Sequence, residues 1–125
     1  MNFENEIKRV IERAFLILKT NNLKFRPMLR RKAINPRRGF EIGRTNLRTG
    51  LITIDILTPR KREPKKISAI LRILCHEVAH HQRPPYRQFY KFKWINRQHY
   101  PKFYKQVDKN IKKLKKDKIL NKYFI

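Results

Sequence analysis

Apolar residues recur at helical spacing in three places along the chain. Over residues 3–19 they appear every three or four positions with charged side chains opposite, which predicts an amphipathic helix. Asn2 stands where an N-cap belongs, and Asn21-Asn22 is expected to end this helix. The predicted apolar stripe consists of Phe3, Ile7, Val10, Ile11, Ala14, Phe15 and Leu18.

Two further helices are predicted in the second half of the chain. Pro64 suits the first turn of one, and Arg83-Pro84-Pro85 stops it. Pro101 suits the first turn of the other, in which lysines surround the apolar positions. The first stripe is Ile67, Ile70, Leu71, Leu74 and Val78, and the second is Phe103, Val107, Ile111 and Leu114.

Alternating residues between the first two helices predict three strands. Residues 23–29 include Pro27, which cannot donate to a ladder, so this strand is expected at a sheet edge. Residues 39–45 and 51–57 follow, joined by a short turn that predicts an antiparallel hairpin. We therefore expect a small, mostly antiparallel sheet. In its last strand Ile52, Ile54 and Ile56 share one face, and Thr53 and Asp55 the other.

The order of these elements predicts an α+β fold in a single domain spanning 1–125. Residues 1–82 would hold the first helix, the sheet and the second helix, and 83–125 a loop, the last helix and a tail. The single cysteine excludes an intrachain disulfide and fits a reducing compartment. No apolar run approaches the 18 or more residues of a membrane span, and the N-terminus lacks a signal-peptide pattern. We expect a soluble, cytoplasmic protein.

The charge balance is strongly basic. The chain has 33 Lys and Arg residues against 9 acidic ones, a net charge of +24. Such a field favours anionic partners: nucleic acid, an anionic membrane surface or acidic peptides. The aromatic and basic stretch at 86–98 has the mixture that binds single-stranded nucleic acid without sequence preference. Compositional drift in an AT-rich genome or a hot habitat explains the charge equally well.

The sequence His76-Glu77-Val78-Ala79-His80 forms an H-E-x-x-H motif. Residues four apart share one face of a helix, so both imidazoles can reach one ion. Zn²⁺ accepts neutral imidazole and activates water, and a carboxylate beside the site can accept the proton of that water. The alternative is a coincidental histidine pair. Its position near the end of a half-buried helix favours the metal site, whereas Cys75 is better explained as a small core residue.

A catalytic zinc ion needs a third protein ligand, and the chain offers few candidates. No glutamate follows Glu77. His81 points about 100° around the helix from His80, and Asp108 is equally explained as a surface residue. His99 lies 19 residues after His80, which allows a loop to return the chain to the ion. We therefore favour His99, with a surface or capping histidine as the alternative.

The order of the predicted elements resembles that of a zincin metallopeptidase of minimal size: an amphipathic helix, a small sheet, an H-E-x-x-H helix, a loop and a further helix. With histidine as the third ligand, the chain is similar to the minigluzincins, soluble members of the gluzincin clan from thermophilic prokaryotes. The resemblance implies hydrolysis of peptide or protein substrates by one Zn²⁺ ion on His76, His80 and His99, with Glu77 as general base. It also implies latency through a C-terminal segment covering the cleft. Many gluzincins carry an acid where this chain has Phe103.

Other site residues are weaker candidates. Tyr100 and Tyr104 are candidate oxyanion donors, with a buried core role as the alternative for each. By analogy with zincins, Leu51, Thr53 and Asp55 would bind substrate through edge pairing of their strand. The apolar tail 119–125 would plug the cleft, join copies of the chain into a homo-oligomer, or pack on its own domain.

Two rival functions remain compatible with the sequence. One is a basic nucleic-acid-binding protein whose metal site is structural or vestigial, although no helix-turn-helix or zinc-finger spacing supports it. The other is a degenerate peptidase fold acting as an interaction module. Retention of Glu77 argues against this second rival, because a structural zinc site does not need that carboxylate.

Overall fold

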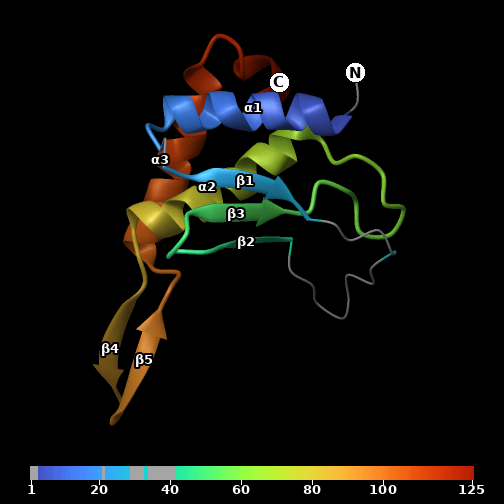
Figure 1. The fold of residues 1–125 in the computed structure, drawn as a ribbon. Helices are drawn as coiled ribbons and strands as arrows, with labels where there is room; N and C mark the ends of the chain where they lie inside the picture. The colour runs from blue at the N-terminus through green and yellow to red at the C-terminus, as the bar shows by residue number, and fades with distance from the viewer. Residues whose placement is uncertain (1–2, 21, 29–32, 34–41) are drawn as a thin grey trace.

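A computed structural model describes residues 3–20, 22–28, 33 and 42–125. It has the predicted α+β architecture, in which helices pack around a small sheet (Figure 1). The elements in chain order are α1 (Phe3–Ile17), β1 (Lys24–Pro27), β2 (Gly43–Thr45), β3 (Leu51–Ile54), α2 (Ile67–Gln82), β4 (Tyr86–Tyr90), β5 (Lys93–Arg97), α3 (Pro101–Lys116) and the 3₁₀-helix η2 (Asn121–Phe124).

The main sheet has three strands in the order β1-β3-β2. β2 pairs with β3 antiparallel, as predicted, and β1 lies at an edge, as Pro27 indicated. β1 runs parallel to β3, however, in register from Lys24 opposite Leu51 to Pro27 opposite Ile54. The sheet is therefore mixed, and the expectation of a mostly antiparallel sheet was wrong for one of its two pairings. The predicted start of β2, at 39–41, lies outside the described residues.

β3 is buried on both faces. Ile52 and Ile54 have no exposed surface, and Thr53 and Asp55, predicted for the opposite face, are buried as well. Asp55 is tolerated there because Arg62 donates from both terminal nitrogens to its carboxylate, at 3.0 and 2.9 Å. A buried carboxylate needs such a partner to offset its lost hydration.

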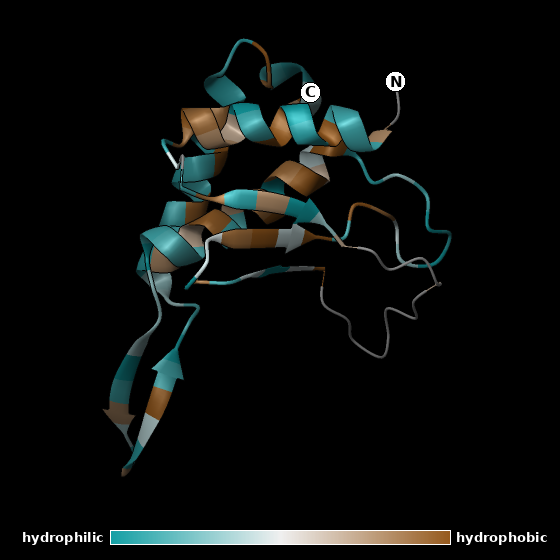
Figure 2. Ribbon diagram, viewed as in Figure 1, coloured by the Kyte–Doolittle hydropathy of each residue, from teal (hydrophilic) through white to brown (hydrophobic). Residues whose placement is uncertain are grey.

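The core lies between α1, α2 and β3. The predicted stripes of α1 and α2 contribute most of it, and Leu114 of α3 and Leu120 of the tail complete it. Figure 2 shows hydrophobic residues along β3 and on α2 behind the sheet. No helix in the described residues combines the length and the apolar character that crossing a bilayer requires.

α2 begins three residues later than Pro64 suggested. Pro64 forms an isolated bridge with Leu57, and the amide of Lys65 donates to the carbonyl of Ile56 at 2.9 Å. These contacts hold the chain extended beside the end of β3, so helical hydrogen bonding starts only at Ile67. The C-terminal boundary falls at Gln82, directly before Arg83-Pro84-Pro85, as predicted.

A second sheet, absent from the sequence prediction, interrupts the chain between α2 and α3. β4 and β5 form an antiparallel hairpin that projects from the body (Figure 1). Its closing pair is Tyr90 opposite Lys93, and its two turn residues, Lys91 and Phe92, have φ of 48° and 65°.

The C-terminal segment 117–125 packs beside α1 (Figure 1). Leu120 is fully buried in the core, and Arg13 of α1 pairs with Asp117 at 2.7 Å. Among the alternatives for the apolar tail, packing on its own domain is confirmed. Leu120 is buried in the core and Tyr123 and Phe124 pack against it, whereas Ile119 and Ile125 stay exposed. Latency through this segment stays a prediction.

Candidate metal centre

α2 presents two histidines on a face next to its apolar stripe. The stripe residues Ile70, Leu71, Leu74 and Val78 are buried in the core, which fixes the rotation of the helix. His76 and His80, one turn apart, are consequently left half-buried at the boundary of the core. The same rotation buries Cys75 completely, and burial raises the pKa of its thiol to about 12. Cys75 is therefore a core residue, as predicted.

His99 reaches the same place from a different part of the chain. It lies between the end of β5 and the start of α3, two residues before Pro101. Tyr100 occupies the N-cap position of α3 in extended conformation, which turns the chain into the helix. Because α3 packs against α2, its N-terminus holds His99 above the histidines of α2.

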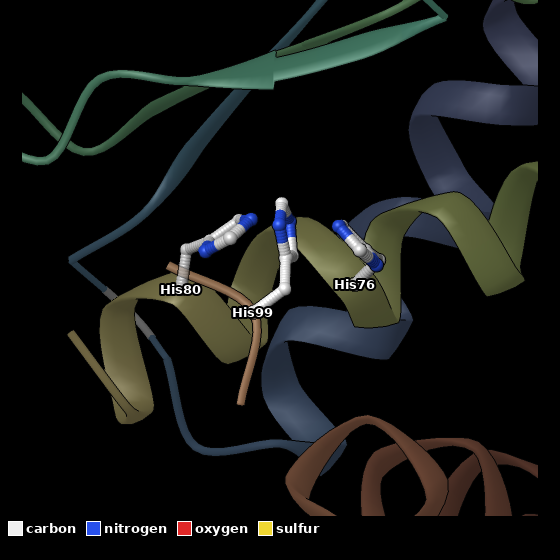
Figure 3. A group of neighbouring side chains, drawn as sticks. All are labelled: His76, His80 and His99. Atoms are coloured by element: carbon white, nitrogen blue, oxygen red, sulfur yellow. The ribbon is translucent and has the colours of Figure 1, made fainter. Parts of the chain in front are cut away.

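The three imidazoles converge (Figure 3). One nitrogen from each of His76, His80 and His99 lies within 4.8 Å of the other two. Their ring centroids are 5.0, 5.2 and 5.0 Å apart, so the rings surround a common point almost symmetrically.

Phe103, which the sequence identified only as part of an apolar stripe, supports all three rings. It is fully buried, and its ring centroid lies 5.0 Å from that of His76, 4.4 Å from that of His80 and 5.2 Å from that of His99. It lies one helical turn beyond His99. Phe103 therefore forms an apolar floor that fixes the three rings by packing.

The surroundings of the histidines favour neutral imidazole. Burial lowers the pKa of His76, and the nearby charge of His99 lowers it further. Burial also lowers the pKa of His80, to about 4, with added repulsion from His76, His99 and His81. A neutral imidazole keeps the lone pair that a metal ion needs, so these rings remain competent ligands below neutral pH.

The histidines open into a pocket of about 420 Å³. One wall is α2 with Glu77, the opposite wall is β2, and the base of the β4–β5 hairpin closes one end. The lining residues are Gly43, Arg44, Thr45, Leu47, His76, Glu77, His80, Pro85, Gln98 and His99. No residue of the C-terminal tail is among them.

Glu77 lines this pocket while keeping only 7% of its surface exposed. β2 can approach it because residue 43 is glycine. A Cβ at Gly43 would lie 2.8 Å from Cγ2 of Ile73 and 3.4 Å from Oε1 of Glu77. A larger residue would thus push the strand away from the carboxylate.

The candidate oxyanion donors do not line the pocket. The hydroxyl of Tyr100 donates to the carbonyl of Pro84 at 2.9 Å. Tyr104 is 51% exposed and stacks on the outer side of the site, with its ring 6.1 Å from that of His99. Asp108 is an exposed residue of α3, which matches its surface interpretation.

The predicted substrate-binding strand is not available for edge pairing. Leu51 and Thr53 belong to β3, whose two edges are taken by β1 and β2 over this stretch, and Asp55 is committed to Arg62. Substrate binding by edge pairing of these residues was therefore a wrong expectation. Among the described strands, β2 borders the pocket instead.

Two polar contacts near the site had no signal in the sequence. Nε2 of His81 forms a hydrogen bond with the hydroxyl of Thr45, which links α2 to β2. Asn110 of α3 is fully buried and donates to the carbonyl of Cys75 at 3.3 Å and to the side chain of Gln82 at 2.7 Å. Isolated polar residues of this kind show no periodic pattern, so their partners emerge only from the fold.

The three histidines fit a zinc ion. Two nitrogens bound to one ion at about 2.1 Å each are at most about 4.2 Å apart. The observed limit of 4.8 Å is close to this spacing. A set of three imidazoles beside an open pocket also has the composition of a catalytic zinc site, with a coordination position left for water or substrate.

Comparisons with known proteins give one similar structure. No family model matches the chain, and no curated protein matches it. A solved structure described as the metallopeptidase zymogen abylysin of Pyrococcus abyssi is 20% identical, over 94% of this chain and 87% of that chain, with a TM-score of 0.48. A likeness at this level does not assign a family, so the function must be argued from the site itself.

Proposed function

We propose that this protein is a zinc-dependent peptidase. The observation that carries the proposal is the convergence of His76, His80 and His99 in an open pocket that Glu77 also lines. Three imidazoles without a cysteine or a second carboxylate are typical of a catalytic rather than a structural zinc site.

Each residue has a definite task in this proposal. When bound, the zinc ion would supply Lewis acidity, which acidifies water and polarises the scissile carbonyl. His76, His80 and His99 hold it. Glu77 accepts the proton of the attacking water and returns it to the leaving amine, as a general base and then a general acid. Phe103 keeps the imidazoles in place.

The substrate would lie along β2. β2 borders the pocket opposite Glu77. One edge of β2 pairs with β3, and its other edge is the outer edge of the described sheet. An extended peptide can add to such an edge through main-chain hydrogen bonds, which gives affinity without strict sequence preference. Arg44 on β2 would favour substrates with acidic side chains.

We infer that the enzyme does not need to lose its C-terminal segment in order to admit a peptide. The C-terminal segment packs against α1, and within the described residues the pocket is open. Latency through the C-terminal segment is therefore not part of the proposal.

The test combines metal analysis with cleavage of casein and of a quenched fluorescent peptide. Wild type should bind one zinc ion per chain and cleave both substrates. Glu77→Gln should keep the zinc and lose activity by a factor of about 10²–10⁴, since only the proton transfer is removed. His99→Ala should lose zinc. The exposed Glu63→Gln serves as a matched control and should behave as wild type. Zinc binding without cleavage in wild type would disprove the peptidase proposal.

A further inference from the structure

The hairpin formed by β4 and β5 is the most exposed apolar feature of the described chain. Phe92 at its tip is 95% exposed and Trp94 is 62% exposed. Tyr86 at the base meets Tyr100, but no other helix or strand of the described chain packs against the hairpin. Large aromatic side chains displayed in this way mark an interaction site, because they contribute nothing to the core.

The turn of the hairpin is built at a conformational cost. Lys91 and Phe92 both have positive φ, the pattern of a type I′ turn. Such turns strongly favour Asn-Gly or a similar pair, because other side chains are strained in this region. Here the sequence places a lysine and a phenylalanine at the point farthest from the body. Binding of these two side chains to a partner would explain why the strained residues are kept in the turn.

The aromatic rings surround the distal half of the hairpin. Successive side chains of a strand face opposite ways, so Phe89 and its cross-strand partner Trp94 lie on one face and Tyr90 on the other. Phe92 occupies the tip. This arrangement suits insertion into an apolar layer that surrounds the tip on all sides. Single-stranded nucleic acid instead binds along a positively charged groove in which aromatic side chains stack successive bases.

The charges of the hairpin are all positive. Between Glu77 and Asp108 the chain has no acidic residue. Several of the cations lie over the rings: Arg87 is 5.5 Å from the ring of Trp94, and Lys91 is 5.3 Å from that of Tyr90. Bases stacking on these rings would have to displace the cations, whereas lipid phosphates could bind them where they are. A second copy of the chain would meet the same positive charge and be repelled.

We propose that the β4–β5 hairpin docks the protein onto anionic phospholipid bilayers. Phe92, Trp94 and their aromatic neighbours enter the headgroup and acyl boundary, where aromatic side chains are favoured at membrane interfaces. Lys91, Lys93, Arg87 and Arg97 bind the lipid phosphates. The hairpin base adjoins Pro85, Gln98 and His99 of the pocket, so docking would hold the three histidines about one strand length from the inserted tip.

The chain contains its own reporter for this proposal, because Trp94 is its only tryptophan. The full-length protein is titrated with vesicles of phosphatidylcholine, with or without phosphatidylglycerol. We expect sedimentation with the anionic vesicles, a blue shift of tryptophan emission, and quenching by lipids brominated on their acyl chains. No blue shift, or equal binding to both kinds of vesicle, would overturn the proposal.

Variants separate the hairpin from the overall charge. Phe92→Gly suits the positive φ and should weaken vesicle binding about tenfold or more. Lys91→Asn with Lys93→Gln should weaken it about thirtyfold. The control, Lys112→Gln with Lys113→Gln, removes the same charge from the exposed face of α3 and should cost much less. Equal loss in both pairs would show diffuse electrostatic binding and overturn the docking assignment.

Nucleic acid is the remaining outcome. Oligothymidylate is titrated in the same buffer, with Trp94 emission and sedimentation recorded. Quenching without a blue shift, at lower ligand concentrations than the vesicles require, would assign the hairpin to single-stranded nucleic acid and overturn the proposal. Unchanged thermal unfolding of all variants excludes misfolding as the cause of lost binding, because the hairpin does not pack on the core.

Discussion

At the scale of single residues, two imidazoles of the candidate metal centre, those of His76 and His80, resist protonation. His80 is half-buried among three other histidines, and its pKa falls from 6.5 to about 4. In the unfolded chain the same ring has its ordinary pKa. The unfolded state therefore binds more protons between these two values, and acid draws the equilibrium towards it.

This difference predicts the pH dependence of stability in the metal-free protein. The free energy of unfolding should be constant above about pH 7 and fall as the pH drops through 6.5 towards 4. Urea unfolding at a series of pH values measures it. His80→Asn should flatten the slope, because asparagine does not titrate. An unchanged slope in that variant would show that the acid sensitivity has another origin.

The packing of Phe103 makes a second prediction at this scale. Phe103→Ala should lower the free energy of unfolding by about 3–5 kcal/mol, the usual cost of emptying a buried aromatic site. It should also weaken zinc binding, because all three imidazoles lose their common support. Competition with a chromophoric chelator measures the affinity. Phe103→Leu is the control and should retain most of both properties. Full zinc affinity in the alanine variant would contradict the supporting role.

At the scale of elements, the site depends on how α3 is held against α2. His76 and His80 belong to one helix, whereas His99 depends on the position of the other. Asn110 ties the two helices through Cys75 and Gln82, and Gln106 donates to its side-chain oxygen at 3.0 Å. A buried amide with this many partners fixes one arrangement of the pair.

Asn110→Ala should therefore affect both stability and metal binding. We expect a loss of about 1–3 kcal/mol, because the half-buried side chains of Gln82 and Gln106 lose their hydrogen-bond partner. Zinc affinity should fall with it, as α3 no longer holds His99 in a single position. Lys109→Ala, at an exposed neighbouring position, should change neither. Destabilisation without any change in zinc affinity would show that Asn110 serves only the core.

The elements that the sequence predicted are those with a strong period. The stripes of α1, α2 and α3 each bury one set of side chains, so their pattern follows directly from packing. β3 has the alternation of a strand, although the structure buries both of its faces. The β4–β5 hairpin was missed for the opposite reason: nearly every residue in it is exposed, and its Lys-Phe turn lacks a turn signal. The parallel direction of β1 depends on pairing with a strand far along the chain, which no local pattern encodes.

The same division holds for the site. The H-E-x-x-H spacing predicted that His76 and His80 would share a face, and elimination led to His99, which the structure places beside them. Tyr100 and Tyr104 were chosen by position in the sequence alone, and the fold turned both away from the pocket. The support from Phe103 could be found only when α3 was placed on α2.

At the scale of the whole molecule, the C-terminal segment completes the core. Its apolar residues indicated burial, but the sequence could not say against which surface. Asp117 organises the segment: it pairs with Arg13, and the amides of Ile119 and Leu120 donate to it at 3.1 Å each. The guanidinium of Arg13 holds the pKa of Asp117 below its ordinary value.

Shortening the chain should therefore destabilise the protein rather than activate it. Leu120→Ala should cost about 2–5 kcal/mol in the free energy of unfolding, and deletion of 117–125 should cost more. Ile125→Ala, at a fully exposed position, is the control. Urea unfolding and peptide cleavage are measured on the same samples. Greater activity in the deletion variant, at unchanged stability, would restore the inhibitory role of the tail.

The hairpin has one more consequence, for the assembly of the metal centre during folding. His80 and His99 are 19 residues apart in sequence, and joining the ends of a flexible segment of that length costs entropy. Pairing of Tyr86 with Arg97 brings the chain back beside its starting point. The flexible segment between His80 and His99 is then reduced to the few residues that flank the hairpin. Hairpins form within microseconds, so His99 can arrive as a near neighbour of His76 and His80 rather than by a long search.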